Sequence, residues 1–261
     1  MPDRPIEAVA AAAAEAGRLA LDRWNTDFRR WEKARGEPVC EIDLAVDALL
    51  RERLRAIDPD AGWLSEETKD DPARLCAARV WVVDPIDGTR DYLRRRPGWC
   101  VSVALVEAGR PVLAVLDAPA REEQWRAQAG GGAFRNGVPI RASTRDLLVG
   151  ARVPADTLPR SEPDLVGVPR PNSIALRIAM VAADEADFCA TLRWGHEWDI
   201  AAAMLVAEEA GATVSDAFGH PIRYNSTKAE AFGLLVTAPA IHAASVERLA
   251  ARAQAASTRR D

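Results

Sequence analysis

The spacing of apolar residues along the chain predicts a set of amphipathic helices. In these segments apolar side chains recur every three or four positions with charged residues between them, the period of a helix that packs one face on a core. The segments with this pattern are residues 6–24, 41–57, 173–186, 197–210 and 240–254. The first is rich in alanine, but acidic and basic residues interrupt its apolar run. The pattern of residues 6–24 therefore predicts an amphipathic helix and not a signal peptide.

Between the helices the pattern changes to short apolar or alternating runs, rich in β-branched residues, which predict strands. These runs are residues 79–84, 100–109, 111–119, 122–143, 146–153, 163–169, 212–216 and 231–239. The turn Ala108–Pro111 predicts a hairpin, and Asn136–Gly137 is a second turn signal. Because helices alternate irregularly with paired strands, we expect a layered α+β fold built as two halves, residues 1–145 and 146–261.

The charge balance and the cysteine pattern narrow the class of protein. The formal net charge of −5 over 261 residues argues against a nucleic-acid-binding surface. The four cysteines are far apart, without the paired spacing of a zinc site, and fit reduced thiols. No window reaches the roughly 18 apolar residues that a membrane span needs. We therefore expect a cytoplasmic protein, monomer or homodimer, whose partner is neither a nucleic-acid polymer nor a membrane.

Several acidic residues stand where a carboxylate is awkward, at the end of an apolar strand, after a chain break or at the start of an apolar helix. They are Asp43, Glu66, Glu67, Asp84, Asp87 and Asp199. Each alone has a simple explanation, such as a turn, a solvated loop or a favourable helix N-terminus. Together they offer what Mg²⁺ takes in proteins, carboxylate oxygens alongside main-chain carbonyls.

One stretch, "DPIDGT" over residues 84–89, concentrates this chemistry. Pro85 fixes its backbone angle and helps to turn the chain, so that both aspartates and the Ile86 carbonyl can face one point. Gly88 and Thr89 then follow with backbone N–H groups that can meet a phosphate. Divalent cations would neutralise the two aspartates at the end of the strand.

The motifs "LSEE", "WVVDPIDGT" and "EWDIAAAMLVAEEAGA", in this order and at these separations, resemble the inositol monophosphatase superfamily of Mg²⁺-dependent, lithium-sensitive phosphomonoesterases. The resemblance runs from "PVCEID" to "PIRYN", nearly the whole chain. It implies a five-layer αβαβα sandwich, with metals held between the two halves. The D-x-D-G-T motif of haloacid dehalogenase phosphatases fits less well, because here the aspartates are three residues apart and lie mid-chain.

The resemblance also implies a role for each of these positions, with two or three Mg²⁺ ions. One metal would be bound by Glu66, Asp84 and the Ile86 carbonyl, and a second by Asp84, Asp87 and Asp199. Glu67 would support a third, more weakly held metal, and Asp43 with Thr89 would orient and deprotonate the attacking water. Most ligands would thus come from residues 1–145, and Asp199 with substrate contacts from residues 146–261. The implied substrate-binding residues are Asp87, Gly88, Thr89, Ser173 and Arg193.

The phosphate ester itself is less well defined by the sequence. Leu192 stands where inositol monophosphatases place a glutamate that binds inositol hydroxyls, which argues against an inositol phosphate unless Glu185 or Glu197 substitutes. "GWLSEE" and "VEAGRPVLAVLDAPA" resemble the 3'(2'),5'-bisphosphate nucleotidase branch, and Arg193 or the run Arg94–Arg96 could meet a second phosphate.

The best interpretation is hydrolysis of adenosine 3',5'-bisphosphate to AMP. "YLRRRPGWCVSVAL" is closer to inositol or histidinol phosphatases, so inositol-1-phosphate and histidinol phosphate stay open as alternatives. A different class of function also stays open: a family member that binds a phosphate ligand without hydrolysing it.

Overall fold

Two main sheets, two small two-stranded sheets and the helices packed on them make up the described part of the molecule, residues 6–34, 36–158 and 162–258 of the computed structural model. The helices are α1 (Ile6–Trp24), α2 (Glu41–Ile57), α3 (Thr89–Leu93), α4 (Ile174–Ala182), α5 (Ala201–Glu209) and α6 (His242–Ser257). The strands up to β9 are β1 (Arg30–Ala34), β2 (Glu37–Cys40), β3 (Gly62–Ser65), β4 (Arg79–Asp87), β5 (Cys100–Glu107), β6 (Arg110–Ala118), β7 (Glu123–Gln128), β8 (Gly132–Arg135) and β9 (Val138–Pro139). The remaining strands are β10 (Arg152–Pro154), β11 (Val166–Val168), β12 (Phe188–His196), β13 (Thr213–Ser215) and β14 (Glu230–Thr237).

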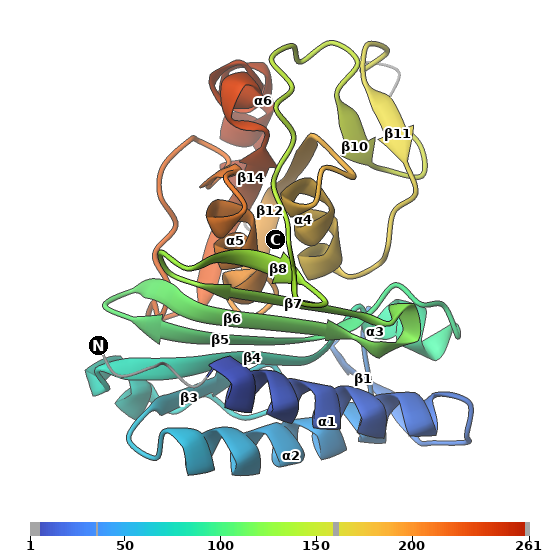
Figure 1. The fold of residues 1–261 in the computed structure, drawn as a ribbon, viewed down its shortest axis with the longest axis vertical. Helices are drawn as coiled ribbons and strands as arrows, with labels where there is room; N and C mark the ends of the chain where they lie inside the picture. The colour runs from blue at the N-terminus through green and yellow to red at the C-terminus, as the bar shows by residue number, and fades with distance from the viewer. Residues whose placement is uncertain (1–5, 35, 159–161, 259–261) are drawn as a thin grey trace.

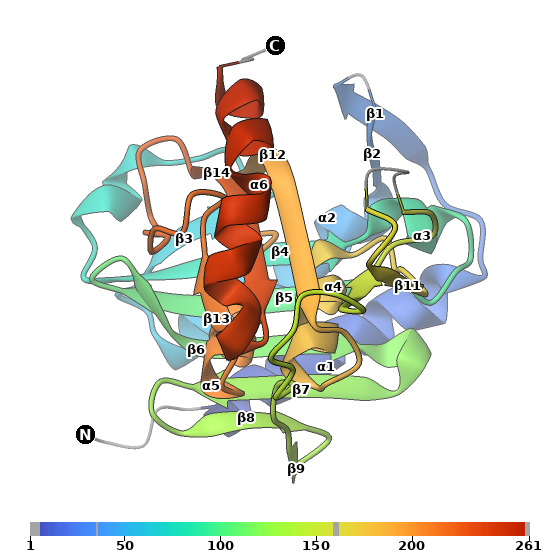
Figure 2. The ribbon, with the colours of Figure 1, turned by 90° about the horizontal axis from the view of Figure 1, so that it is seen from above.

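The layers follow the order helix, sheet, helix, sheet, helix (Figure 1). Strands β3 to β9 form a seven-stranded sheet in sequence order, in which only β3 and β4 run parallel. Helices α1 and α2 pack on one face of this sheet and α5 on the other. Beyond α4 and α5 lies a three-stranded sheet of order β12-β14-β13, and α6 runs along its outer face (Figure 2). The predicted αβαβα sandwich is confirmed.

Strand β4 shows why the seven-stranded sheet is buried on both faces. Its successive side chains point to opposite sides. Val80 and Val82 pack into the core on the side of α4 and α5, whereas Trp81 and Val83 pack into the core under α1 and α2. A strand covered on both faces has a continuous apolar sequence, as this one has.

Most predicted elements are present, with some corrected bounds. The first two helices begin and end as predicted, and β5 and β6 form the predicted hairpin. The strand predicted over residues 146–153 is wrong for most of its length, since only residues 152–154 form a strand. The reason is Arg145, whose guanidinium binds the carbonyls of Leu147 and Val149 and turns the segment away from a sheet. Strands β1, β2, β3 and β12 were not predicted.

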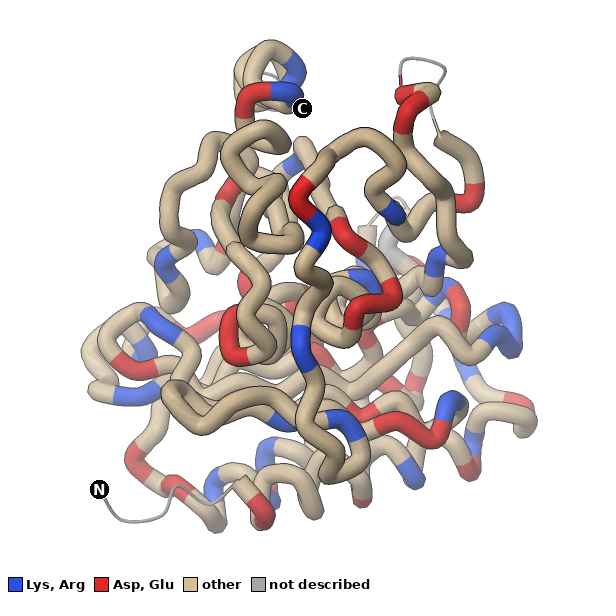
Figure 3. The backbone as a smooth tube through the Cα atoms, turned by 45° about the horizontal axis from the view of Figure 1, so that its top comes forward, with Lys and Arg blue, Asp and Glu red and all other residues tan. Residues whose placement is uncertain are grey.

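Acidic and basic residues are interspersed along the traced backbone (Figure 3). Among the helices of the described ranges, none is long and apolar enough to cross a bilayer.

Asp117 is a buried aspartate of β6 that faces α1, outside the region of the motifs. Its Oδ1 accepts a hydrogen bond from Gln124 at 2.8 Å, and a Cβ added to Gly17 of α1 would lie 2.1 Å from its Oδ2. Burial raises the pKa of Asp117 from an ordinary 3.8 to about 6. The folded protein therefore binds a proton here between about pH 4 and pH 6 that the unfolded chain has released. Stability contributed at this site falls as the pH rises through that window.

We expect Asp117→Asn to be more stable than the parent above pH 6, by roughly 2 kcal/mol, because asparagine keeps the acceptor oxygen without the buried charge. Urea unfolding at pH 4 and pH 8 checks this, and the difference between the two proteins should shrink at pH 4. An equal difference at both pH values would contradict the assigned cause.

Candidate active site

Two aspartates reach the same side of the seven-stranded sheet because β4 is irregular between them. Asp84 pairs with Ser102 of β5 and Asp87 pairs with Cys100, so a step of three residues along β4 corresponds to a step of two along β5. In a regular strand, side chains three positions apart face opposite sides. The extra residue, within Pro85–Ile86, makes a bulge that lets both carboxylates line one cleft. The local sequence thus places two acids together where regular pairing would separate them.

The buried carboxylates of this cleft raise one another's pKa. Burial raises the pKa of Asp84 well above its ordinary value, and neighbouring carboxylates raise it further. Those neighbours are Glu66, Asp87 and Asp199. The pKa of Asp199 is raised in the same way, first by burial and then by Asp87 and Glu66. Clustered buried carboxylates of this kind favour either a proton or a cation.

Helix α4 holds Asp87 through its first residues. The Ser173 hydroxyl donates to Asp87 at 2.5 Å, and the Ala175 N–H donates to the same oxygen at 2.7 Å. The same hydroxyl accepts the Leu176 N–H at 2.9 Å and so caps the helix. Burial still raises the pKa of Asp87 to about 6. Ser173 is fully buried, so its position supports Asp87 and offers no direct contact to a substrate.

Asp43 and Thr89 lie together beside the Ile86 carbonyl. The Thr89 hydroxyl lies 3.1 Å from the Ile86 carbonyl oxygen and 3.4 Å from Asp43 Oδ1. The other oxygen of Asp43 accepts the Cys40 N–H and the Cys40 thiol, each at 2.9 Å. Burial raises the pKa of Asp43 to about 6. Asp43 is therefore ionised at pH 7 and keeps one oxygen directed at Thr89.

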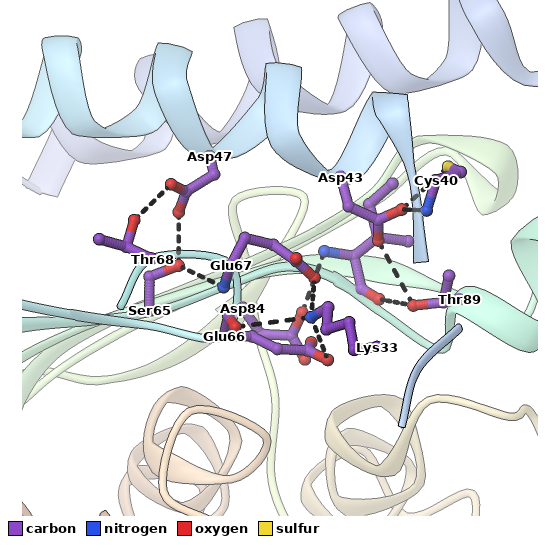
Figure 4. A network of polar contacts seen from close by, with 11 residues as sticks. Lys33, Cys40, Asp43, Asp47, Ser65, Glu66, Glu67, Thr68, Asp84 and Thr89 are labelled. Carbon is purple, nitrogen blue, oxygen red and sulfur yellow. Dashed lines mark hydrogen bonds and ion pairs between the residues drawn. The ribbon is translucent and has the colours of Figure 1, made fainter. Parts of the chain in front are cut away.

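A lysine of the unpredicted β1–β2 hairpin holds the two glutamates. Lys33 Nζ lies 3.3 Å from Glu66 Oε1 and 2.5 Å from Glu67 Oε1 (Figure 4). Burial opposes the charge of Lys33, yet the two carboxylates together raise its pKa. Burial raises the pKa of Glu67 to about 7. In this arrangement Lys33 is the counter-charge of the glutamates.

The cleft has a volume of about 680 Å³ and is lined by both acidic and basic residues. Its carboxylates are those of Glu66, Asp84, Asp87 and Asp199, and Gly88 and Thr89 line it as well. Gly88 has φ +97° and a Cβ there would lie 2.6 Å from the Gly98 carbonyl oxygen, so only glycine fits. The cleft is also lined by four arginines, Arg90, Arg170, Arg177 and Arg193. The cleft therefore combines carboxylates, which suit a cation, with guanidinium groups, which suit an anion.

Three of these arginines lie near one another. Burial lowers the pKa of Arg177, and the neighbouring positive charges of Arg170 and Arg193 lower it as well. Arg177 donates to the carbonyls of Pro171 and Asn172 at 2.8 and 2.6 Å, bonds that fix its guanidinium without neutralising it. The predicted alternative, the run Arg94–Arg96, is absent from the lining of the cleft.

A bulge in β12 directs the Arg193 side chain to the cleft. Between Thr191 and Trp194 this strand has two residues, Leu192 and Arg193, opposite the single residue Gly233 of β14. Leu192 packs with the apolar cluster under α6, and Arg193 lines the cleft. A Cβ on Gly233, which has φ +67°, would lie 2.7 Å from the Thr191 carbonyl oxygen, so the bulge requires glycine there.

The two glutamates considered as replacements for the missing inositol-binding acid are engaged elsewhere. Glu197 is fully buried and accepts the backbone N–H groups of Asn225 and Ser226 at 2.6 and 3.0 Å. Glu185 pairs with Arg135 at 2.5 Å. Neither lines the cleft formed by the described residues.

The chemistry of the donor set fits a divalent cation. As the side chains stand in the described ranges, no three Asp, Glu, His or Cys residues form a group that could hold a metal ion. In this arrangement Lys33 contacts the glutamates, and Ser173 and α4 bind Asp87. Buried oxygen ligands with raised pKa values nevertheless match what a hard cation binds.

Comparison with known proteins settles the family. The model of the inositol monophosphatase family matches residues 2–259. The chain belongs to the inositol monophosphatase family. Members of this family are magnesium-dependent phosphatases, so the chain is a phosphatase. The phosphatase class predicted from the sequence is confirmed.

Relatives within the inositol monophosphatase family have different substrates in their names. The 3'(2'),5'-bisphosphate nucleotidase CysQ of Escherichia coli is 32% identical over 74% of this chain and 81% of its own length. The fructose-1,6-bisphosphatase/inositol-1-monophosphatase of Thermotoga maritima is 34% identical over 78% and 81%. A solved inositol monophosphatase of the same organism superposes with a TM-score of 0.81 at 28% identity, covering 95% of this chain and 97% of that one. These similarities establish fold and reaction class and leave the phosphate ester open.

Proposed function

We propose that this phosphatase hydrolyses a small phosphate monoester that carries a second phosphate, and that its substrate is a 3'(2'),5'-bisphosphate nucleotide such as adenosine 3',5'-bisphosphate, giving AMP. The observation that supports this is the cluster of Arg170, Arg177 and Arg193 lining the same cleft as the carboxylates. Guanidinium groups that lie near one another can share one anion, and phosphate is an anion that accepts their paired N–H donors well. Arg170 is already paired with Asp156 at 3.0 Å, so a second phosphate would chiefly meet Arg177 and Arg193.

In this proposal the carboxylates hold two or three Mg²⁺ ions. Glu66, Asp84 and the Ile86 carbonyl would hold one, Asp84, Asp87 and Asp199 would hold a second, and Glu67 would support a third. When bound, Mg²⁺ polarises the phosphate and makes water more acidic. Lys33, which lines the cleft and lies 3.3 Å from Glu66, would have to release that carboxylate for this.

Asp43 and Thr89 are the groups that handle the proton of the attacking water. Thr89 can accept a hydrogen bond from water while its own proton points to Asp43, whose Oδ1 is free of Cys40. Because the pKa of Asp43 is about 6, the carboxylate is charged at neutral pH and can take up a proton. Attack is then in line on phosphorus, without a phosphorylated enzyme.

The other phosphate esters have less support. An inositol phosphate lacks its acidic partner, because Leu192 packs in an apolar cluster, and Glu185 and Glu197 are engaged elsewhere. Histidinol phosphate needs an acid for its amine, and Glu197 is not available for it. All four cysteines are free thiols, which agrees with the proposed cytoplasmic location.

Phosphate release from three substrates tests the proposal: adenosine 3',5'-bisphosphate, myo-inositol 1-phosphate and L-histidinol phosphate, each with Mg²⁺. We expect the bisphosphate to be preferred in kcat/KM by about 10-fold or more, the effect of one charged hydrogen bond. EDTA should abolish release and lithium should inhibit it. Preference for a monophosphate would overturn the substrate and keep the metal chemistry. No release from any of them would overturn all three substrates and point to a phosphate ester outside this panel, or to a member that binds phosphate without catalysis.

A further inference from the structure

Helix α2 carries a second buried aspartate one turn beyond Asp43. Asp47 is only 7% exposed and follows Asp43 by four residues, so both side chains project from one face of the helix. Asp43 reaches towards Thr89, whereas Asp47 reaches the turn that follows β3 (Figure 4).

Both oxygens of Asp47 are used by that turn. Its Oδ1 accepts a hydrogen bond from the Ser65 hydroxyl, and its Oδ2 accepts one from the Thr68 hydroxyl at 2.7 Å. Ser65 Oγ also accepts the Glu67 backbone N–H at 3.4 Å. The two residues between these hydroxyls are Glu66 and Glu67. A carboxylate that accepts hydrogen bonds from two hydroxyl groups forms charge-assisted bonds, which are stronger than hydrogen bonds between neutral groups.

The turn is therefore held from two sides. From the cleft side, Lys33 contacts the carboxylates of Glu66 and Glu67. From the helix side, Asp47 holds the residues on either side of these two glutamates. Asp47 is not among the described residues that line the cleft. A cation that takes Glu66 removes a contact of Lys33 and leaves the bonds of Asp47 intact. Asp47 thus fixes the backbone of the turn whether or not Lys33 is engaged.

We propose that Asp47, Ser65 and Thr68 form a clamp that positions Glu66 and Glu67 for cation binding. Asp47 is then a positioning residue of this phosphatase and touches neither metal nor substrate. The inference rests on the proposed role of Glu66 as a metal ligand.

Calorimetric titration of the full chain with Mg²⁺, without substrate, tests the clamp. We expect Asp47→Asn and Thr68→Val to weaken Mg²⁺ binding about 10-fold or more, as loss of outer-shell support does at other metal sites. Thr68→Ser keeps the hydroxyl and is the matched control, with affinity expected within about 3-fold of the parent. At saturating Mg²⁺ the turnover of Thr68→Val should recover towards that of the parent.

The outcomes separate the clamp from the metal site itself. If the parent chain binds Mg²⁺ and Thr68→Val binds it equally well, the clamp is wrong, even if the variant melts at a lower temperature. If the parent binds no Mg²⁺, the metal-site proposal fails first and the clamp fails with it. If Asp47→Asn does not fold, the Mg²⁺ affinities of Thr68→Val and Thr68→Ser still test the clamp.

Discussion

Asp84→Asn is expected to lower phosphate release by about 1,000-fold or more at saturating Mg²⁺, the scale on which a preorganised electrostatic group contributes to catalysis. Asp84 is the carboxylate assigned to both metals, and three other acids surround it. Its replacement by a neutral amide removes one negative charge from the centre of the cluster. The same change relieves repulsion between buried charges, so the melting temperature without Mg²⁺ should rise. Lower activity with higher stability is the signature of a site whose carboxylates are placed together for binding.

Asp117→Asn is the matched control for this variant, since Asp117 is also a buried aspartate with a raised pKa and lies outside the lining of the cleft. Its phosphate release should match that of the parent. Melting curves with and without Mg²⁺ complete the test, because the stabilisation by Mg²⁺ seen in the parent should be lost in Asp84→Asn. Turnover of Asp84→Asn within about 10-fold of the parent would refute the assignment of Asp84 as a shared ligand.

Arg193→Ala should change which substrate is preferred. We expect kcat/KM for adenosine 3',5'-bisphosphate to fall about 10- to 100-fold, the cost of one lost charged hydrogen bond. Adenosine 3'-monophosphate has the same base and sugar without the second phosphate, so its kcat/KM should change by no more than about 3-fold. Arg193 also lowers the pKa of Asp199, but an effect through Asp199 would reach both substrates equally. The ratio of the two kcat/KM values therefore isolates recognition of the second phosphate.

Arg94→Ala serves as the control for this change, because Arg94 belongs to the arginine run that does not line the cleft. Its substrate ratio should equal that of the parent. An unchanged ratio in Arg193→Ala as well would leave the second phosphate without its assigned partner and would point back to a monophosphate substrate.

The acidic residues of the cleft could be found from the sequence because several of them stand in an apolar context that makes a charge costly, and because the motifs that carry them resemble a known family. Asp84 and Asp87 end a run that is buried on both faces of the sheet, and that contrast is visible in the letters alone. The helices α1 and α2 were equally clear, because their apolar period is regular over four turns or more. The local sequence pattern was therefore sufficient to predict these acids and these two helices.

Of the arginines in the cleft, the sequence pointed only to Arg193, and Arg170 and Arg177 were missed. An isolated arginine such as Arg177 looks like the solvated face of a helix, and only the fold brings Arg170, Arg177 and Arg193 together. Strand β12 was missed because its bulge breaks the alternation that predicts a strand. The hairpin that carries Lys33 was missed because all five residues of β1 are exposed, which leaves no apolar period to detect. These features depend on tertiary contacts that no short window contains.

The bulge in β12 has a consequence for how such an enzyme can change. The acids assigned to the reaction come mostly from α2 and the seven-stranded sheet, whereas Arg193 comes from the three-stranded sheet, at the one point where two residues face Gly233. Loss of a single residue there would restore regular pairing and change which side chain of β12 lines the cleft, while the acids of α2 and the seven-stranded sheet stay in place. Under the role proposed for Arg193, selectivity would then be a modular trait. A lineage could acquire a new phosphate ester by insertion or deletion in one strand and keep most of the acids that carry the hydrolytic chemistry.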